Sequence, residues 1–267
     1  MSLFAGKKPE AILIQPPLVQ LNSPYPAPYY LKSFLTQHGF KVCVRDHSIG
    51  LFERIFCRTG LEKIFAAVGG SAVQKKVGRE NFYIKETLYN IECFISEQNL
   101  WINSIDRLVD FLRGRDDEWG HFLALSNGCL PSGPRHDAFA EKQGGAILPD
   151  HAKLLATKLL SDLADFINVA LDPGFNLIRY SPHGAESSAG YQNFDAVEKS
   201  LSGFIMEEFY RPMLFEEWEN LKPELPFVLG ITIPFPGCLA GALVCAASAK
   251  NYFCSNVFCI TSWVCCL

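Results

Sequence analysis

The stretch from Pro226 to Leu243, PFVLGITIPFPGCLAGAL, most constrains how this chain folds. Phe227 to Ile233 is an unbroken run of apolar and β-prone residues, which is typical of a strand buried on both faces of a parallel sheet. The run breaks at Pro234, and apolar residues resume at helical spacing from Leu239. A strand, a tight turn and a helix form the unit that places a binding loop at the carboxyl end of a parallel strand. An ordinary buried strand followed by a proline turn would give the same pattern.

The start of the chain predicts the elements that pair with this strand. Ala11 to Gln15 is a short apolar run that reads as a first buried strand and ends at Pro16-Pro17. The loop that follows is rich in proline and tyrosine, so it is either a stiff wall for a ligand or a cover for the sheet edge. A helix fits Tyr29 to Gln37, and Phe40 to Arg45 alternates as a second strand. The first part of the chain therefore reads as a β-α-β crossover.

The middle of the chain is mostly helical in pattern. Its clearest helix spans Asp150 to Leu171, with Asp150 suited to the N-cap, a continuous apolar stripe, and a stop at Asp172-Pro173-Gly174. Further helices are expected over residues 51–68, 85–94, 102–112, 194–204 and 213–221. These patterns predict an α/β fold, with an incomplete Rossmann-like (flavodoxin-like) parallel sheet interrupted by a large, mainly helical insertion. The expected segments are 1–48 for the first β-α-β part, 49–222 for the insertion, and 223–267 for the return to the sheet.

Charge and composition exclude several classes of protein. The formal net charge is −4 and no basic run exceeds two residues, so no nucleic-acid footprint is visible. The first ten residues have no apolar signal region, and no apolar run approaches the ~18–20 residues of a membrane span. A cytoplasmic protein is therefore expected. Its ten cysteines would then be reduced thiols, and no C-x2-C or C-x3-C step predicts a metal site.

Three segments carry a resemblance to a known family. They are ILIQPPLVQLNSPYPAPYYLKSFLTQHGFKVCVRD near the start, IDRLVDFLRGRDDEWGHFLALSNGCLPSGPR in the middle, and LGITIPFPGCLAGAL near the end. Together they are similar to the amino-terminal, cobalamin-binding-type region in one subgroup of radical S-adenosylmethionine proteins. The resemblance implies a Rossmann-like domain. In an intact parent it further implies a [4Fe–4S] cluster, S-adenosylmethionine and a corrinoid, used for methyl transfer or a rearrangement.

The chain departs from that family in two respects. The C-x3-C-x2-C triplet that holds the cluster in the family does not occur, so this chain is expected to lack the catalytic core and not to catalyse a radical reaction alone. A histidine-ligated corrinoid is usually bound through D-x-H-x-x-G. Here the corresponding residues are Arg45-Asp46-His47-Ser48-Ile49-Gly50. The H-x-x-G half is present, but the acid stands directly before the histidine instead of two residues before it. His47 is therefore either a remnant ligand or an unrelated histidine at the start of a helix. Asp46 would either hold a ligand hydroxyl or cap that helix.

Parallel sheets bind ligands outside the carboxyl ends of their strands. The candidate cofactor-binding residues are accordingly those at the expected strand ends: Gln15, Pro16, Pro17, Asp46, His47, Pro234, Phe235, Pro236 and Gly237. A corrinoid is the expected small-molecule partner, and an open sheet edge predicts self-association. The alternative is a module that binds no corrinoid and grips a substrate or another protein through its helical insertion. Neither a G-x-S-x-G elbow nor an H-E-x-x-H motif nor a P-loop is present.

Overall fold

The computed structural model divides the chain into two compact units. Unit 1 comprises residues 1–52 and 177–267, and unit 2 comprises residues 53–176. The boundary after residue 52 falls within helix α2 (His47–Ile55). The residues that the structure describes are 8–19, 21, 24–70, 90–125, 131–143, 151–175, 177, 194–223 and 225–263.

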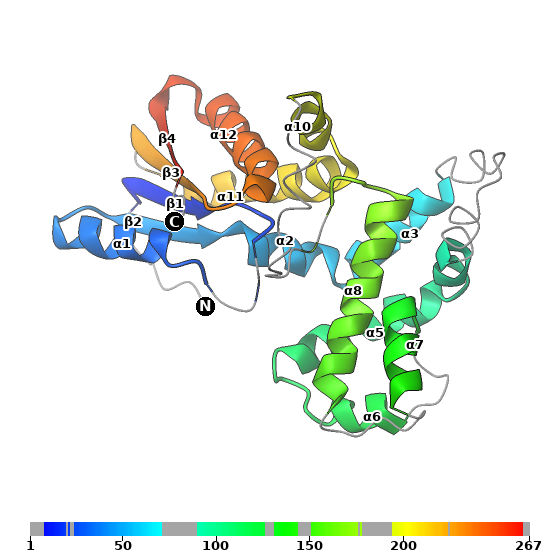
Figure 1. Cartoon of the computed structure of the whole chain (residues 1–267). Coiled ribbons are helices and arrows are strands. Elements are labelled where there is room, and N and C mark those ends of the chain that lie inside the picture. The colour runs from blue at the N-terminus through cyan, green and yellow to red at the C-terminus, as the bar shows by residue number, and fades with distance from the viewer. Residues whose placement is uncertain are drawn as a thin grey trace. The chain divides into compact units, whose positions relative to one another are not determined.

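Unit 1 is built on a parallel sheet of four strands (Figure 1). The strands are β1 (Ala11–Gln15), β2 (Val42–Asp46), β3 (Phe227–Ile233) and β4 (Val257–Trp263), and they lie in the order β2-β1-β3-β4. All three neighbouring pairs are parallel. The α/β class with an open, Rossmann-like parallel sheet, as predicted from the sequence, is therefore confirmed.

The central pair of this sheet joins the two segments that the sequence singled out. Ile12 pairs with Leu229 and Ile14 with Ile231, although most of the chain separates β1 from β3. All four of these side chains are at most 1% exposed. Continuous apolar runs suit this position, because a central parallel strand is covered on both faces. The prediction that segments 11–46 and 226–246 lie side by side as parallel strands is confirmed.

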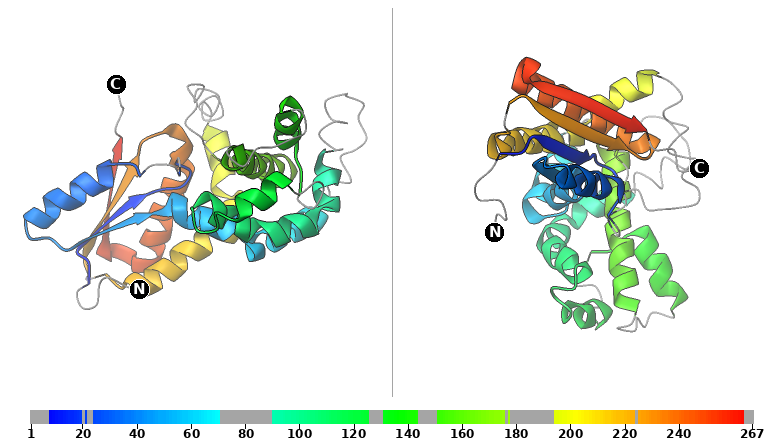
Figure 2. Two further views of the ribbon diagram at one scale, coloured as in Figure 1. Left: turned by 90° about the horizontal axis from the view of Figure 1, so that it is seen from below. Right: turned by 90° about the vertical axis from the view of Figure 1, so that its left-hand side faces the viewer.

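Helices cover the two faces of the sheet from opposite sides. α1 (Ala27–Gln37) contributes Leu35 to a cluster with Ala11, Leu13 and Val42 on one face. α12 (Leu239–Phe253) lies on the other face (Figure 2). Since β1 leads outward through α1 to β2, and β3 leads outward through α12 to β4, the chain direction reverses between β1 and β3. Such a reversal is the topological switch point at which doubly wound folds bind ligands.

Residues 194–221 belong to unit 1, although the sequence assigned them to the insertion. They form α10 (Phe194–Leu201), a π-helix η3 (Met206–Tyr210) and α11 (Arg211–Leu221). Trp218 of α11 explains the placement, because its ring packs edge-on against Phe253 of α12 and its indole Nε1 donates to Ser248 Oγ at 3.1 Å. The apolar stripe of α11 is thus buried against the sheet's own helix.

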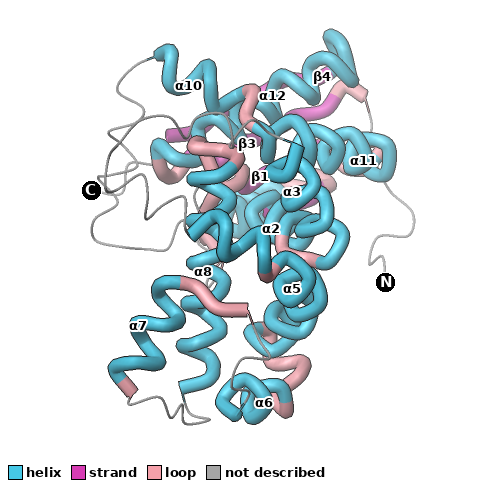
Figure 3. The backbone as a smooth tube through the Cα atoms, turned by 90° about the vertical axis from the view of Figure 1, so that its right-hand side faces the viewer, coloured by secondary structure: helices cyan, strands magenta, loops and turns pink. Residues whose placement is uncertain are grey.

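The described part of unit 2 is helical (Figure 3). Trp101, Phe94 and Phe166 stack in its core, with ring centroids 5.0 and 4.8 Å apart. Asp162 is buried and accepts the backbone N–H groups of Arg135 and His136, which open one of the helices. Its helices include α3 (Arg58–Gly70), α5 (Gln98–Leu112), α6 (Trp119–Leu125), α7 (Pro134–Lys142) and α8 (Ala152–Ala170), and residues 90–96 are helical as well.

Several elements differ from the sequence predictions: the helix predicted over 51–68 is two helices, α2 and α3, and α5 begins at Gln98 rather than at residue 102. α1 begins at Ala27 rather than Tyr29, because Pro28 is accommodated in the first turn of a helix. β2 begins at Val42 rather than Phe40 and includes Asp46. The predicted N-cap Asp150 and the start of the helix predicted over 85–94 lie outside the described residues.

β4 forms one edge of the sheet, and Phe258 on it is 62% exposed. This is the open edge that the sequence analysis anticipated, and self-association through it stays a prediction. Within the described parts of the chain, no helix combines the length and the apolar character needed to cross a membrane.

The contact between the turn after β1 and helix α12 gives a first prediction. A Cβ atom added to Gly241 would lie 2.8 Å from the Cγ and carbonyl oxygen of Pro17, so Gly241→Ala forces the two elements apart. We expect the substitution to lower the free energy of unfolding by roughly 1–3 kcal/mol, as measured by urea denaturation.

Gly69→Ala is the matched control, because Gly69 also lies in a helix and nothing stands within 4 Å of an added Cβ. Alanine at this position should change the free energy of unfolding by less than about 0.5 kcal/mol, because Gly69 is the second-last residue of α3. Equal effects of the two substitutions would show that Gly241 is not held against Pro17.

Candidate functional site

The turns that leave β1 and β3 contact each other at the carboxyl edge of the sheet. Tyr25 and Phe235 meet edge to face, with ring centroids 6.2 Å apart. The Cys238 thiol, at the start of α12, lies 4.0 Å from the Leu18 carbonyl oxygen. The structure therefore brings together the first and last groups of candidate residues that the sequence placed far apart. These two groups of residues lie on either side of the switch point between β1 and β3.

Helix α2 fixes the turn after β1 from the other side. Ser48 Oγ donates to the Pro16 carbonyl and accepts the Val19 N–H, with both distances at 3.0 Å. Asp46 Oδ1 accepts the N–H groups of Ser48 and Ile49, at 2.9 and 3.1 Å. Asp46 therefore caps α2, one of the two roles considered for it. The turn is held rigidly by these bonds.

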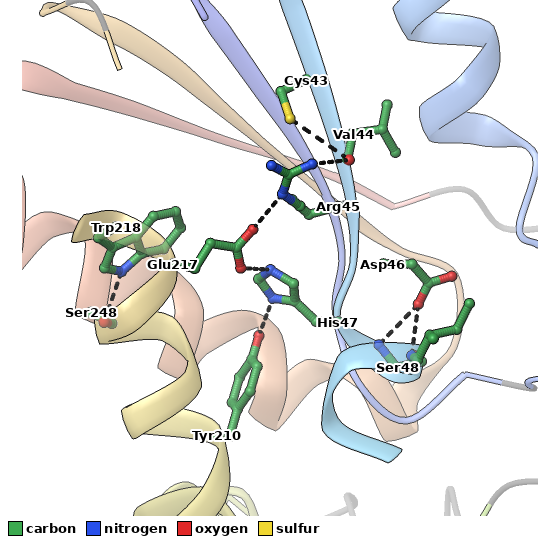
Figure 4. A network of polar contacts seen from close by, with 11 residues as sticks. Cys43, Val44, Arg45, Asp46, His47, Ser48, Tyr210, Glu217, Trp218 and Ser248 are labelled. Atoms are coloured by element: carbon green, nitrogen blue, oxygen red, sulfur yellow. Dashed lines mark hydrogen bonds and ion pairs between the residues drawn. The ribbon is translucent and has the colours of Figure 1, made fainter. Parts of the chain in front are cut away.

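A partly buried network of polar side chains, in which Arg45 is 41% exposed, links the end of β2 to the helices that cover the sheet (Figure 4). Arg45 Nε lies 2.9 Å from Glu217 Oε1, and His47 Nε2 lies 2.7 Å from Glu217 Oε2. His47 Nδ1 lies 2.8 Å from the Tyr210 hydroxyl. The side chains of Glu217 and His47 are 14% and 2% exposed. Arg45 and His47 point toward α11, whereas Asp46 between them points the other way (Figure 4).

His47 contacts a partner through each of its ring nitrogens. Nε2 lies 2.7 Å from Glu217 Oε2 and forms an ion pair with it when the imidazole is protonated. Nδ1 shares a hydrogen bond with the Tyr210 hydroxyl at 2.8 Å, and the tautomer of the ring decides which of the two donates. Glu217 and Tyr210 therefore lie against both ring nitrogens of His47.

Burial and charge shift the pKa values of these groups in opposite directions. Burial alone would raise the pKa of Glu217, but His47 and Arg45 outweigh it and hold the pKa below its usual value. Burial, reinforced by the neighbouring Cys245 thiol, raises the pKa of Tyr210 well above its usual value. Burial also raises the pKa of Cys245. The network thus contains an ionised carboxylate and a neutral phenol at physiological pH.

Gly50 has a packing role in the same region. A Cβ atom at this position would lie 3.1 Å from Met213 Sδ on α11. His47 and Gly50 stand one turn apart on α2, and they meet Tyr210 and Met213, which are also three residues apart. The H-x-x-G half of the corrinoid pattern is therefore accounted for by the contact of α2 with η3 and α11.

The remaining candidate residues lie at the strand ends, as the sequence analysis placed them. Gln15 ends β1 and is 2% exposed, and Pro16 and Pro17 after it are buried. Pro234 and Phe235 form the turn after β3, which continues into a 3-10 turn, η4, over Pro236–Cys238 that includes the buried Gly237. No cluster of three or more His, Cys, Asp or Glu side chains suited to a metal ion occurs among the described residues. Burial raises the pKa of the Cys238 thiol to about 12, so this thiol is a poor nucleophile.

Sequence reasoning missed Arg45, Tyr210 and Glu217. His47 and Tyr210 are 163 residues apart, and nothing local to either residue predicts their contact. One signal was present on α11: Glu217 lies on the stripe formed by Met213, Leu214 and Trp218, where an apolar residue is expected. A lone acid on an apolar stripe indicates a buried partner of opposite charge.

The network predicts a pH-dependent contribution to stability. Glu217→Gln keeps the shape of the side chain but removes the charge that Arg45 and His47 face, so we expect a loss of about 3 kcal/mol at pH 7. Because the pKa of Glu217 is lowered on folding, its stabilisation is full above the unfolded-state value of about 4.3. The stabilisation is lost as pH falls through the folded-state value. Urea denaturation at a series of pH values measures the difference.

Glu219→Gln on the same helix is the control, because Glu219 is exposed and its removal should change stability by less than about 0.5 kcal/mol at any pH. If the two variants lost the same stability at pH 7, or if the loss from Glu217→Gln did not shrink at acid pH, the ionised network would be refuted.

No protein-family model, curated protein or solved structure matches this chain.

Proposed function

We propose that unit 1 is the cobalamin-binding-type, Rossmann-like region of a radical S-adenosylmethionine protein, and that its ligand lies at the carboxyl edge between β1 and β3. The observation that carries the proposal is the switch point. β1 and β3 are parallel neighbours, and their outgoing turns meet through Tyr25 and Phe235. Switch points are where open α/β sheets bind nucleotides and similar cofactors. The identification of the ligand as a corrinoid comes from the resemblance of the strand and turn sequences to that family.

Of the two ways to hold a corrinoid, axial ligation and contact with the rim of the ring, the residues present fit only the second. His47 does not suit the role of axial ligand, because Glu217 and Tyr210 occupy both of its ring nitrogens. A bound corrinoid would supply cobalt-centred chemistry, and the chain would hold the ring by its rim. The turns provide half-buried aromatic surface for this, from Tyr25 and Phe235, beside the ends of β1 and β2.

A titration with hydroxocobalamin tests the proposal directly. We expect a saturable change in its visible spectrum on addition of the full chain. Phe235→Ala should weaken binding by roughly threefold to tenfold, because it removes one aromatic wall of the edge. Phe215→Ala is the matched control, since Phe215 is 52% exposed on α11 and contacts Tyr252 rather than the turns.

No spectral change with the folded wild-type chain would refute corrinoid binding and favour the alternative of an interaction module. Equal weakening by the two phenylalanine variants would place the ligand away from the β1–β3 edge.

A second measurement tests whether the protein supplies an axial ligand to cobalt. Cob(II)inamide has no base of its own, so its electron paramagnetic resonance spectrum shows nitrogen splitting only if the protein supplies an imidazole. We expect no such splitting with the wild-type chain, because His47 is engaged by Glu217 and Tyr210. A nitrogen triplet would show that the network opens and that His47 ligates cobalt.

A further inference from the structure

One face of the sheet in unit 1 is only partly covered. On that face α1 lies over β1 and β2, where Leu35 packs against the cluster that contains Leu13 and Val42. α12 lies over β3 and β4 on the opposite face (Figure 2). No described helix covers β4 on the α1 face, although parallel sheets are normally covered on both faces. Within the described residues, the place beside α1 is therefore open.

The strands beside α1 present apolar groups to this open place. Val228 on β3 packs on the same cluster as Leu35, so it points to the α1 face, and it is half-buried. Phe258 on β4 pairs with Val228, points the same way and is 62% exposed. Gly230 lies on this face too, since an added Cβ atom would lie 2.7 Å from Leu13 Cδ2. β3 and β4 therefore expose an apolar strip that includes a phenylalanine ring.

The flank of α1 that borders this strip is apolar as well. Tyr30, Leu31 and Phe34 are 75%, 43% and 58% exposed. The right-handed β1-α1-β2 crossover turns the flank with Leu31 and Phe34 toward β3, whereas Lys32 lies on the flank toward the outer edge at β2. The strip and this flank form one surface, which we call the α1–β4 surface: Tyr30, Leu31, Phe34, Val228, Gly230 and Phe258.

The α1–β4 surface is complementary in shape to a second copy of itself. Two strands at a spacing of ~4.8 Å span about 10 Å, which is the width of one helix. The strip thus has room for one helix, and the helix that rises beside it is α1. Phe34 and Phe258 stand at the same level along the strands, because their neighbours Leu35 and Val228 pack on one cluster.

We propose that two copies of the chain form a dimer through this surface, with α1 of each copy packed on β3 and β4 of the other. A two-fold axis parallel to the strands makes both contacts at once and preserves the level, so Phe34 of one copy meets Phe258 of the second. No side chain of the α1–β4 surface is charged. Identical copies therefore do not repel each other there, and nothing on the surface selects a partner of opposite charge.

The size of the surface is sufficient for a dimer. At the observed exposures, each of the three aromatic side chains offers roughly 100–150 Å². With Leu31, two copies together bury on the order of 1,000 Å², the size at which specific interfaces begin. This dimer uses a face of the sheet rather than the free edge of β4. It also leaves Tyr25 and Phe235 untouched, so it does not depend on corrinoid binding.

Sedimentation velocity of the full chain over a series of concentrations tests the proposal. We expect the wild-type chain to form a dimer. Phe34→Lys and Phe258→Glu should each raise its dissociation constant at least about 100-fold, because the two-fold axis brings two unpaired charges into the interface. Phe215→Lys is the matched control, since Phe215 is 52% exposed on α11, at the other face, and should leave the dimer unchanged.

An equal mixture of the Phe34→Lys and Phe258→Glu chains gives a sharper test. In the mixed dimer the new lysine meets the new glutamate, and the second contact keeps both phenylalanines, so we expect the dimer to return. Circular dichroism checks that each variant folds, and Tyr30→Glu replaces whichever single variant does not. A monomeric wild-type chain, a dimer unaffected by charges on this surface, or two folded variants that stay monomeric when mixed would each overturn the proposal.

Discussion

The pairing of β1 with β3 is the constraint on which unit 1 depends. The two strands come from opposite ends of the chain, yet Ile14 lies beside Ile231 at the centre of the sheet. Closing so long a connection is less costly than it looks, because loop-closure entropy rises only with the logarithm of length, by about 0.6 kcal/mol for each doubling. Two apolar strands buried on both faces can offset such a cost. A large insertion between neighbouring strands is therefore physically tolerable, provided that its two ends are held.

The partly buried network holds those ends. His47 begins the helix through which the chain leaves the sheet, and Tyr210 and Glu217 lie on the segment through which the chain returns. A buried ion pair adds little net stability, because desolvation consumes most of the attraction. Its geometric demands are strict, however, since Glu217 must meet Arg45 and His47 at once. We regard the network as fixing how α11 sits beside the sheet, with apolar packing of Trp218 supplying the stability.

The sequence predicted those parts of the fold whose causes are local. β1 and β3 were found with correct bounds, because continuous apolar runs ended by proline have few other interpretations. The start of α1 was placed two residues late, since Pro28 reads as a loop residue although a first helical turn accepts it. Tyr210 could not be found as a site residue, because only the folded chain brings it to His47.

The H-x-x-G pattern shows how helix packing by itself can favour both residues of a motif. In a histidine-ligated corrinoid site the histidine must offer a free ring nitrogen, and here both nitrogens are used within the protein. At Gly50 a Cβ atom would lie 3.1 Å from Met213 Sδ, so the packing of α11 on α2 favours a small residue there. One helix–helix contact thus selects both residues three positions apart, which is the natural spacing of neighbours on a helix face. When a motif has helical spacing, the packing of its own helix is therefore the first explanation to test. The residues that the motif contacts across the helix interface decide between packing and ligand binding.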